Sequence, residues 1–281
     1  MNRKKALFYL VITSILWSIG GLFIKLVDWN PVAIAGARSG IAAVVMLLYL
    51  KKPIKSIGKI KLLGGCSYAS LLILFVTANK LTTSANAILL QFTAPIWVAL
   101  FARWFLNEKI HKYDWVTIVV VLFGMTLFFV GDLRSGYIVG NIVAVLSGIA
   151  MAGVVIFLKL QDNSSPVEMT LVGNIITFII GIPFFFLSFP SWESILGLMI
   201  LGVFQLGFSY ILYAISIKYV SSIEAILIPV IEPLLNPLWV FLVTGEAPGR
   251  YALLGGIIVI IAIIIRNLYQ QAGESADISQ Y

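Results

Sequence analysis

Two charged residues lie in the middle of long apolar stretches, and they are the first candidates for chemistry in this sequence. Arg38 lies within residues 32–50, and Glu232 lies midway along residues 222–243. A charge at the centre of an apolar membrane helix costs at least about 2.5 kcal/mol, so it normally has a purpose. Arg38 could bind a carboxylate, and Glu232 could bind an ammonium group or carry a proton. The structural alternative is a fixed ion pair between the two residues that joins two helices.

Prolines interrupt the segment that holds Glu232 and one other segment. The four that we predict to kink helices are Pro95, Pro229, Pro233 and Pro237. Each proline inside a helix removes a backbone hydrogen bond and leaves a carbonyl group without its donor. Because lipid offers that carbonyl no partner, a helix with several prolines is expected to be buried and to line a cavity. Kinks that serve packing alone are the alternative.

Uncharged polar and aromatic side chains supply the remaining candidates. Gln205, Ser209 and Tyr213 recur at helical spacing and form a polar stripe along an apolar segment. Such a stripe can line a pore, or it can hydrogen-bond to neighbouring helices. The predicted substrate-binding or coupling residues are Glu232, Arg38, Trp17, Gln91, Asn236, Gln205, Ser209, Tyr210 and Tyr213.

The composition indicates the kind of element that must position these residues. The chain has 281 residues, of which 60% are hydrophobic and 11% are charged. An average soluble domain is about 45–50% apolar and about 25% charged. The composition therefore excludes a soluble globular enzyme, a disordered chain and a secreted disulfide scaffold. The single cysteine, Cys66, cannot form an intramolecular disulfide, and we expect it to be a small buried residue.

Ten apolar segments are long enough to cross a bilayer, whose core needs roughly 20 residues of helix. The sequence thus predicts an all-α integral membrane protein of ten transmembrane helices, followed by a short polar tail at 270–281. The predicted spans are 6–27, 32–50, 61–79, 84–105, 114–131, 137–159, 166–189, 193–217, 222–243 and 249–269.

The basic residues predict the orientation of these spans. If the N-terminus lies in the cytoplasm, most of the 19 lysines and arginines fall on the cytoplasmic side, as the positive-inside rule requires. Both termini are therefore predicted to be cytoplasmic. Glu168 and Glu224 fall near the same ends of their spans, and we expect them to reach water there. The basic residues outside that pattern are Lys25, Lys80, Arg134, Arg250 and the intraspan Arg38.

The sequence contains an internal repeat. Residues 78–108 align with 216–246 without a gap, and 23–26 align with 157–160. The chain is therefore predicted to consist of two five-helix repeats, 1–134 and 135–269. Because five is odd, the repeats enter the membrane in opposite directions, which is the architecture of many secondary transporters. In the alignment of 78–108 with 216–246, the identical pairs are Lys80/Lys218, Ser84/Ser222, Ala87/Ala225, Ile88/Ile226, Leu89/Leu227, Pro95/Pro233, Leu100/Leu238 and Glu108/Glu246.

Several local patterns carry a resemblance to a known family. They are the alanine-rich start of 84–105, its midspan proline, Arg38 in Ala35-Gly36-Ala37-Arg38, and the span end Leu106-Asn107-Glu108 with its second-half echo Thr244-Gly245-Glu246. With these features the chain resembles the drug/metabolite transporter superfamily, specifically its ten-helix EamA branch. The resemblance covers essentially the whole chain. It implies a carrier of the cytoplasmic membrane, most often an exporter of amino acids, other metabolites or toxic compounds.

Three functions remain open at the level of the sequence. The first is a secondary active transporter that exports amino acids or related zwitterions by alternating access, with its site between the two repeats. Arg38 and Glu232 in one cavity would suit a zwitterion, whereas Arg38 would repel a simple cation. The second function is an uncoupled or multidrug carrier of organic cations. The third is an integral membrane enzyme, which a single histidine and a lone midspan carboxylate disfavour.

The expected partners follow from the same observations. The sequence has no Walker A motif and no room for an ATP-binding domain, so a gradient must supply the energy, with protons as a candidate coupling ion. No cofactor and no metal are expected. The net charge of +7 indicates topology and attraction to anionic lipid rather than nucleic acid. The predicted partners are a small-molecule substrate and the lipid bilayer, and the oligomeric state stays open.

Overall fold

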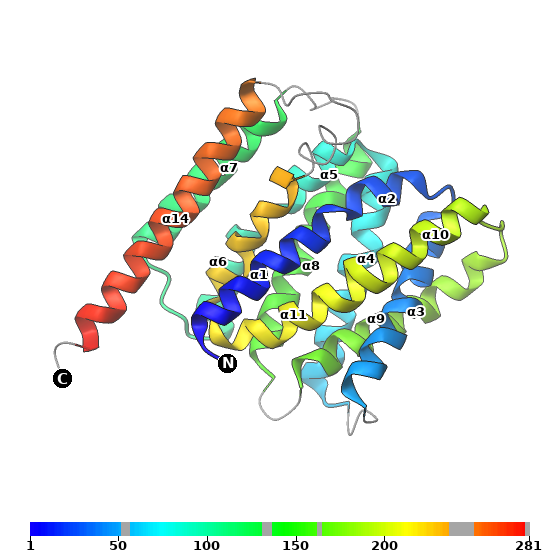
Figure 1. Cartoon of the computed structure of the whole chain (residues 1–281), viewed down its shortest axis with the longest axis horizontal. Coiled ribbons are helices and arrows are strands. Elements are labelled where there is room, and N and C mark those ends of the chain that lie inside the picture. Colours follow the sequence, from blue (N-terminus) through cyan, green and yellow to red (C-terminus); the bar gives the residue numbers. More distant parts are fainter. Residues whose placement is uncertain (52–56, 131–136, 162–164, 236–249, 279–281) are drawn as a thin grey trace.

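A computed structural model describes residues 1–51, 57–130, 137–161, 165–235 and 250–278 of the chain. Every regular element in these ranges is a helix (Figure 1). The first half contains α1 (Arg3–Ser18), α2 (Gly20–Leu26), α3 (Pro31–Leu50), α4 (Lys59–Leu81), α5 (Ser84–Gln91), α6 (Ala94–Phe105) and α7 (Lys112–Phe129).

The second half repeats this series with more interruptions. Its ninth segment ends, as far as the structure describes it, with helical residues 231–235. The elements are α8 (Ile138–Lys159), α9 (Pro166–Phe185), α10 (Trp192–Ile200), the π-helix η1 (Leu201–Phe208), α11 (Ser209–Ser216), the 3-10 turn η2 (Ile217–Tyr219), α12 (Ser222–Leu227), the 3-10 turn η3 (Ile228–Val230) and α14 (Arg250–Ile278).

Eight helical stretches among the described residues are long and apolar enough to cross a membrane. They correspond to eight of the ten predicted spans. The fifth predicted span is the 18-residue helix α7, and the ninth continues into residues that the structure does not describe. The prediction of an all-helical, multi-pass membrane protein is thus confirmed, while the cytoplasmic location of the termini stays a prediction. The tail predicted at 270–281 continues α14 as a helix to Ile278.

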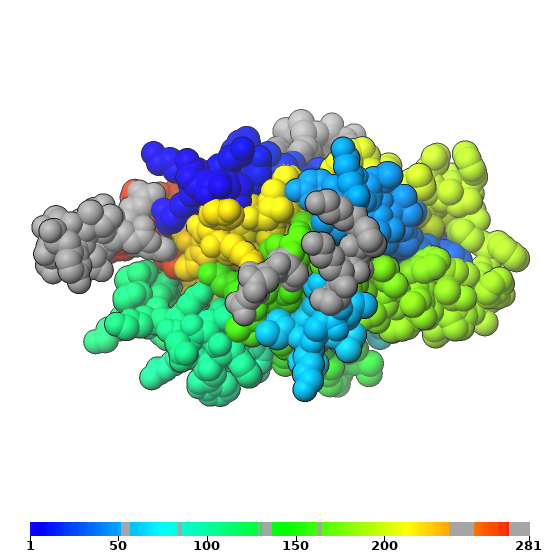
Figure 2. Space-filling model, turned by 90° about the horizontal axis from the view of Figure 1, so that it is seen from below, coloured from blue at the N-terminus to red at the C-terminus, as the bar shows by residue number. Residues whose placement is uncertain are grey.

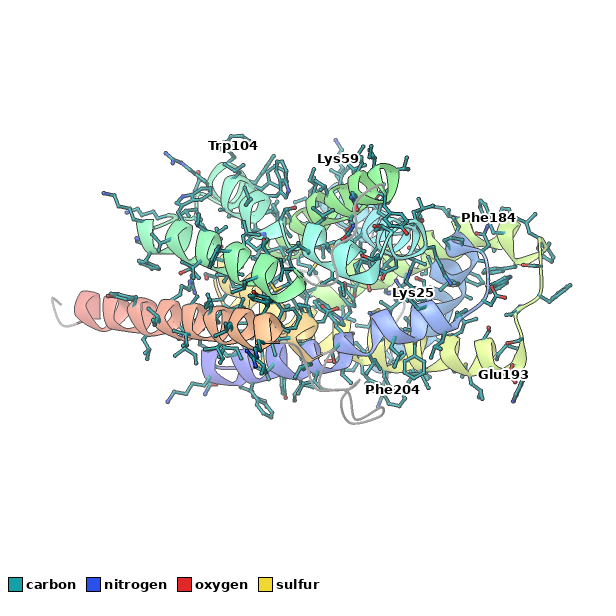
Figure 3. The ribbon with its side chains drawn as sticks, turned by 90° about the horizontal axis from the view of Figure 1, so that it is seen from above. Lys25, Lys59, Trp104, Phe184, Glu193 and Phe204 are labelled. Atoms are coloured by element: carbon teal, nitrogen blue, oxygen red, sulfur yellow. The ribbon has the colours of Figure 1, made fainter. Side chains whose placement is uncertain are left out.

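Large apolar side chains point outward from the helix bundle, as expected of a surface that meets lipid. Trp104 and Phe204 are examples, with 68% and 48% of their surface exposed (Figure 3). Cys66 also lies on this outer surface, so the prediction that it is buried was wrong. An apolar residue of a membrane helix has no need to be buried in protein, because lipid solvates it as well.

Close contacts between glycines hold several helices together. A Cβ atom built on Gly36 of α3 would lie 2.7 Å from the Cα atom of Gly181 in α9, so only glycine fits there. On Gly255 of α14 it would lie 2.5 Å from the backbone nitrogen of Phe128 in α7. Small residues allow such approaches between membrane helices. The second contact joins α7 and α14, which run side by side along one edge of the molecule (Figure 1).

The two repeats make equivalent contacts at their lysines. The Nζ atom of Lys80 donates a hydrogen bond to the carbonyl oxygen of Val27 at 2.8 Å. Lys218 is the repeat partner of Lys80, and its Nζ atom donates to the carbonyl oxygen of Gln161. Val27 and Gln161 directly follow the matching stretches 23–26 and 157–160. The same hydrogen bond from a lysine to a backbone carbonyl therefore occurs once in each repeat, as the internal sequence repeat predicts.

The helix ends that carry most of the basic residues lie together on one face, which we call the basic face. Ion pairs link these ends to one another: Arg3 with Glu224, Lys61 with Glu168, Lys159 with Glu108, and Arg266 with both Asp114 and Glu224. Figure 2 views the molecule from this side, where the N-terminal helix in blue lies beside the yellow segment that includes Glu224. The expectation that Glu224 reaches water was wrong. Its side chain is 1% exposed, because two arginines enclose it.

Candidate functional site

Several helices are interrupted around one cavity inside the bundle. The first helical span is interrupted at Ile19, between α1 and α2. Another span is interrupted at residues 92–93, between α5 and α6. The span formed by α10 and α11 contains the π-helix η1 between these two helices, and α12 continues into the 3-10 turn η3. Interrupted helices at membrane depth occur where the backbone lines a substrate or ion site, and π-helical turns are also frequent at functional sites.

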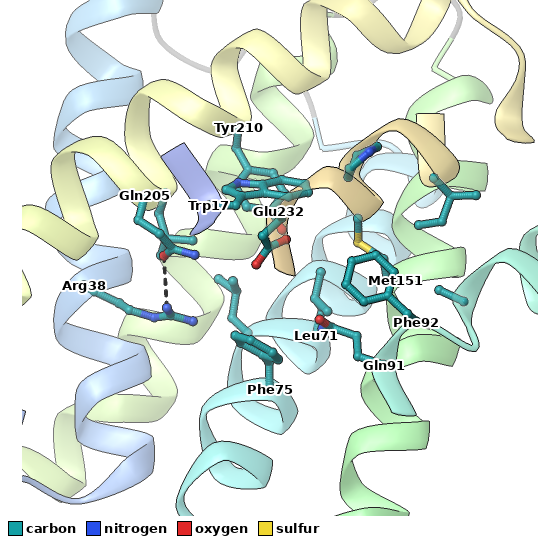
Figure 4. A pocket seen from close by; sticks show the side chains of 15 residues that line it. Trp17, Arg38, Leu71, Phe75, Gln91, Phe92, Met151, Gln205, Tyr210 and Glu232 are labelled. Carbon is teal, nitrogen blue, oxygen red and sulfur yellow. Dashed lines mark hydrogen bonds between the residues drawn. The ribbon is translucent and has the colours of Figure 1, made fainter. Parts of the chain in front are cut away.

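The cavity is small in this structure, with an open volume of about 40 Å³. Its polar lining includes six of the nine residues predicted for the site. These six residues are Trp17, Arg38, Gln91, Gln205, Tyr210 and Glu232 (Figure 4). The rest of its lining is apolar and consists of Leu71, Leu72, Phe75, Phe92, Ala94, Met151, Leu206, Ile226 and Pro229.

Arg38 is fully buried on the side of α3 that faces this cavity. One of its terminal nitrogens donates a hydrogen bond to Oε1 of Gln205 at 3.1 Å. Its Nε atom has no hydrogen-bond partner among the described residues. The guanidinium group therefore keeps donors that are available to a ligand, since it carries five N–H groups in all.

Glu232 lines the cavity from the helical residues 231–235 that follow η3 (Figure 4). Within the described part of the chain, no ion pair joins it to Arg38. The fixed ion pair that the sequence left open is thus not present in this structure. Two opposite charges instead share one cavity, with Gln205 as the polar neighbour of the positive one.

An aromatic cluster forms the wall beside Glu232. The ring of Trp17 packs on Tyr210, with ring centres 4.7 Å apart, and on Tyr213 at 5.2 Å. Its Nε1 atom donates a hydrogen bond to Oγ of Ser209 at 2.8 Å. The hydroxyl of Tyr213 donates to the carbonyl oxygen of Ala225 at 3.1 Å. Ser209 and Tyr213 are therefore buried behind the wall, where they hold Trp17 and α12 rather than line the cavity.

The prolines fall at the helix interruptions. Pro95 lies in the first turn of α6, directly after the break that follows Gln91. Pro229 lies in η3 and contacts the cavity, and Pro233 is buried in the helical residues that follow. The remaining candidates, Asn236 and Pro237, and the motif Thr244-Gly245-Glu246 lie outside the described residues.

Sequence reasoning missed the apolar part of the lining. Leu71, Leu72 and Phe75 lie on one face of α4. Phe92, at the break between α5 and α6, and Met151 of α8 face them. Their spacing in the sequence is the usual helical one, and residues that pack helices together follow the same spacing. A polar residue stands out in an apolar segment, whereas an apolar cavity residue does not. No signal in the sequence could have separated these residues from the core.

Comparisons with known proteins agree on one family. The sequence matches the EamA-like transporter family twice, over residues 4–130 and 138–268. It is 27% identical to the uncharacterized transporter YdfC of Bacillus subtilis (strain 168), over 92% of this chain and 90% of that protein. It is 24% identical to the pseudopaline exporter CntI of Pseudomonas aeruginosa (strain UCBPP-PA14), over 93% of this chain and 95% of that protein.

The fold also matches a known structure. A solved crystal structure superposes with a TM-score of 0.84 and covers 97% of this chain and 100% of its own. The two sequences are 16% identical, so this likeness concerns the fold alone. The two family matches fall on the two halves that the internal repeat predicted. Because the family consists of transporters, the interpretation as a membrane enzyme is excluded.

Proposed function

Because the chain belongs to the EamA-like transporter family, we propose that it is a secondary active carrier that exports amino acids or related zwitterions by alternating access. The family makes the chain a membrane transporter, and the cavity supports the finer statement. The site that we propose lies between the two repeats, with Arg38 from the first and Glu232 from the second. The domain boundaries at residues 134 and 269 belong to the same proposal.

The observation that carries this proposal is the pair of opposite charges that share a cavity without pairing with each other. A buried charge is stable only with a partner or hydrogen bonds around it. A substrate with a carboxylate and an ammonium group would compensate both charges at once. The carboxylate would accept hydrogen bonds from Arg38, and the ammonium group would donate to Glu232.

Two further observations support export by alternating access. The repeats are related in sequence, and the interrupted helices surround the cavity, as in transporters built from inverted repeats. One relative is named as an exporter, which supports the outward direction of flux here. Glu232 is the residue that we propose to couple transport to a proton gradient, because a carboxylate in such a cavity can alternate between proton and ammonium.

A second candidate is an uncoupled or multidrug carrier of organic cations. The aromatic and apolar wall favours it, since Trp17, Tyr210 and Phe75 could bind a flat or hydrophobic cation. The buried guanidinium group of Arg38 argues against it, because a positive charge raises the energy of a cation in the same cavity.

Transport by the purified protein in liposomes tests the proposal. We expect exchange of a labelled amino acid against unlabelled amino acids, and weak competition by their carboxamides and by tetraphenylphosphonium. Glu232→Gln should abolish the response to an imposed pH gradient. The matched control is Glu193→Gln, because Glu193 is an exposed carboxylate at the start of α10. Uptake by Glu232→Gln with unchanged affinity and unchanged pH response would overturn the role of Glu232.

A further inference from the structure

The side chain of Gln205 occupies a space that exists because residue 20 is a glycine. A Cβ atom built on Gly20 would lie 2.9 Å from Nε2 of Gln205 and 3.2 Å from its Cδ atom. Such distances are shorter than contacts that side chains tolerate, so any larger residue would push the amide away. Gly20 starts α2 directly after the break between α1 and α2, and its φ angle is not in the positive range that would require a glycine. The requirement is therefore for space.

Gln205 is held firmly on its other sides. It lies in η1 and is 6% exposed. Ser209 donates a hydrogen bond to its backbone carbonyl, and Trp17 in turn donates to Ser209. The same π-helix packs tightly on α3, because a Cβ atom on Gly202 would lie 2.9 Å from the carbonyl oxygen of Arg38. The backbone of Gln205 is fixed relative to Arg38, so the direction of its amide group depends on the space at residue 20.

The amide of Gln205 in turn restrains Arg38. Its Oε1 atom accepts the hydrogen bond from a terminal nitrogen of the guanidinium group, which is fully buried. The hydrogen bond to one terminal nitrogen restricts rotation of the guanidinium group, and because the group is planar, its other donors lie in fixed directions relative to that nitrogen. Figure 4 shows this group beside Gln205, with its free end directed toward the cavity.

We propose that Gly20 and Gln205 are positioning residues that hold the guanidinium group of Arg38 in the plane that receives the carboxylate of a substrate. The proposal rests on the proposed function, in which Arg38 binds a carboxylate. It adds that recognition depends on a three-residue chain from α2 through η1 to α3. Gly20 acts by leaving room for the amide, and Gln205 acts through its hydrogen bond to Arg38.

Binding measurements on purified protein test the ligand side of this proposal. The probes are the twenty amino acids, their carboxamides and the plain carboxylate 4-methylpentanoate, each followed by its thermal shift. Gln205→Leu removes the hydrogen bond that orients Arg38, so it should weaken carboxylate binding by about tenfold or more. Gly20→Ala should have a similar effect. The carboxamides should change by less than about twofold, because they do not engage the charge of Arg38.

A matched control lies next to Gly20. A Cβ atom on Gly21 would meet one atom, Cδ1 of Ile88, at an ordinary 3.9 Å. Gly21→Ala makes the same chemical change one residue away without reaching Gln205. It should leave the affinity for every probe within about twofold of the unchanged protein, since surroundings with room for a methyl group tolerate it.

Double substitutions separate positioning from a general loss of packing. In a Gln205→Ala background the space beside residue 20 is empty, so Gly20→Ala should no longer affect carboxylate binding or thermal stability. In an Arg38→Met background, Gln205→Leu should likewise lose most of its effect on stability. Such non-additivity is the signature of residues that act through one another. These stability cycles need no ligand, so they also apply if the proposed substrate class is wrong.

The possible outcomes distinguish the positioning proposal from the zwitterion proposal. If 4-methylpentanoate binds in a Gln205-dependent manner but amino acids do not, the positioning chain stands and the zwitterion proposal fails. If no carboxylate binds the unchanged protein, both fail. If the effects of Gly20→Ala and Gln205→Leu are additive, or if carboxamides weaken as much as carboxylates, the positioning proposal is overturned and the contacts serve packing alone.

Discussion

Lysines at equivalent positions of the two repeats lie on opposite faces of the bundle and make different contacts. Lys25 and Lys159 are repeat equivalents. On one face Lys25 donates to the backbone carbonyl of Thr82 at 3.2 Å. On the basic face Lys159 donates to the carboxylate of Glu108 at 3.0 Å, and Glu108 also accepts two hydrogen bonds from Ser222. Equivalent lysines thus meet a neutral oxygen on one face and a charged one on the other.

This difference shows how a duplicated chain becomes asymmetric. Glu108 belongs to the first repeat, whereas Lys159 and Ser222 belong to the second, so their contacts tie the repeats together. The contact of Lys159 with Glu108 joins two opposite charges and so adds Coulomb attraction to the hydrogen bond, whereas the contact of Lys25 has a charge on one side only. The basic face is therefore the more firmly held of the two in this structure. Glu246, the sequence equivalent of Glu108, lies outside the described residues.

The largest effect on stability is expected when a buried arginine is removed from the basic face. Arg266 is 3% exposed and pairs with Asp114 at 3.0 Å and with Glu224 at 3.6 Å. Breaking a buried pair from one side typically costs about 3–5 kcal/mol, because it leaves an uncompensated charge. We expect Arg266→Met to lower the unfolding temperature in detergent by many degrees. Arg250→Met, at the other end of α14, should change it little, and equal losses would contradict the comparison.

A smaller effect is expected at the link between the repeats. Glu108→Gln keeps the shape of the side chain and removes its charge, which should weaken the link by about 1–2 kcal/mol. The readout is the alkylation of Met151→Cys, in a Cys66→Ser background, by an impermeant maleimide added on the side of the basic face. Labelling should rise several-fold with Glu108→Gln and stay unchanged with Lys25→Met. The opposite pattern would mean that the basic face is the looser one.

The neutral network on the opposite face should matter less. Oδ1 of Asn141 accepts hydrogen bonds from Thr82 at 3.1 Å and from Asn86 at 3.2 Å. Loss of neutral hydrogen bonds of this kind costs about 1 kcal/mol. Asn141→Ala should therefore lower the thermal stability by only a few degrees. Asn141→Asp is a useful companion, because a carboxylate there would imitate the basic face, and a gain in stability would sharpen the comparison.

The smallest difference is expected between Lys80 and Lys218. Both donate to equivalent backbone carbonyls, so the two contacts are the same in chemistry. Because Lys80 is partly exposed and Lys218 is exposed, Lys80→Met and Lys218→Met should each cost about 1 kcal/mol or less, and thermal unfolding should give matching values. A clear difference between them would show that the repeat equivalence does not extend to these contacts.

The features that depend on the polarity of residues and on the length of apolar segments could be predicted from the sequence. Helices of about 20 apolar residues are required by the bilayer, so the spans could be predicted from their length. Arg38 and Glu232 could be singled out because a charge in an apolar segment is costly. Glu224 shows the limit of that argument. Its place near a span end suggested contact with water, but the nearby arginines came from distant parts of the chain.

Other features depend on contacts that no local pattern contains. The partner of Arg38 is Gln205, which is 167 residues away in the chain. Gly20 and Gly21 look alike in the sequence, yet one faces an amide group and the other faces open space beside Ile88. The break at Ile19 carries no proline to mark it. Tertiary packing decides each of these, so the sequence could propose the members of the site but not their roles.

The π-helix η1 has a consequence for how this chain can vary. A π turn contains one residue more than an α turn, because its hydrogen bonds span five residues rather than four. Removing one residue between Leu201 and Phe208 could therefore restore α geometry while α10 and α11 keep their ends. The deletion would change the direction in which the side chain of Gln205 points relative to Arg38. Relatives that have gained or lost a residue at this point would thus differ in ligand preference while retaining the same ten-segment pattern.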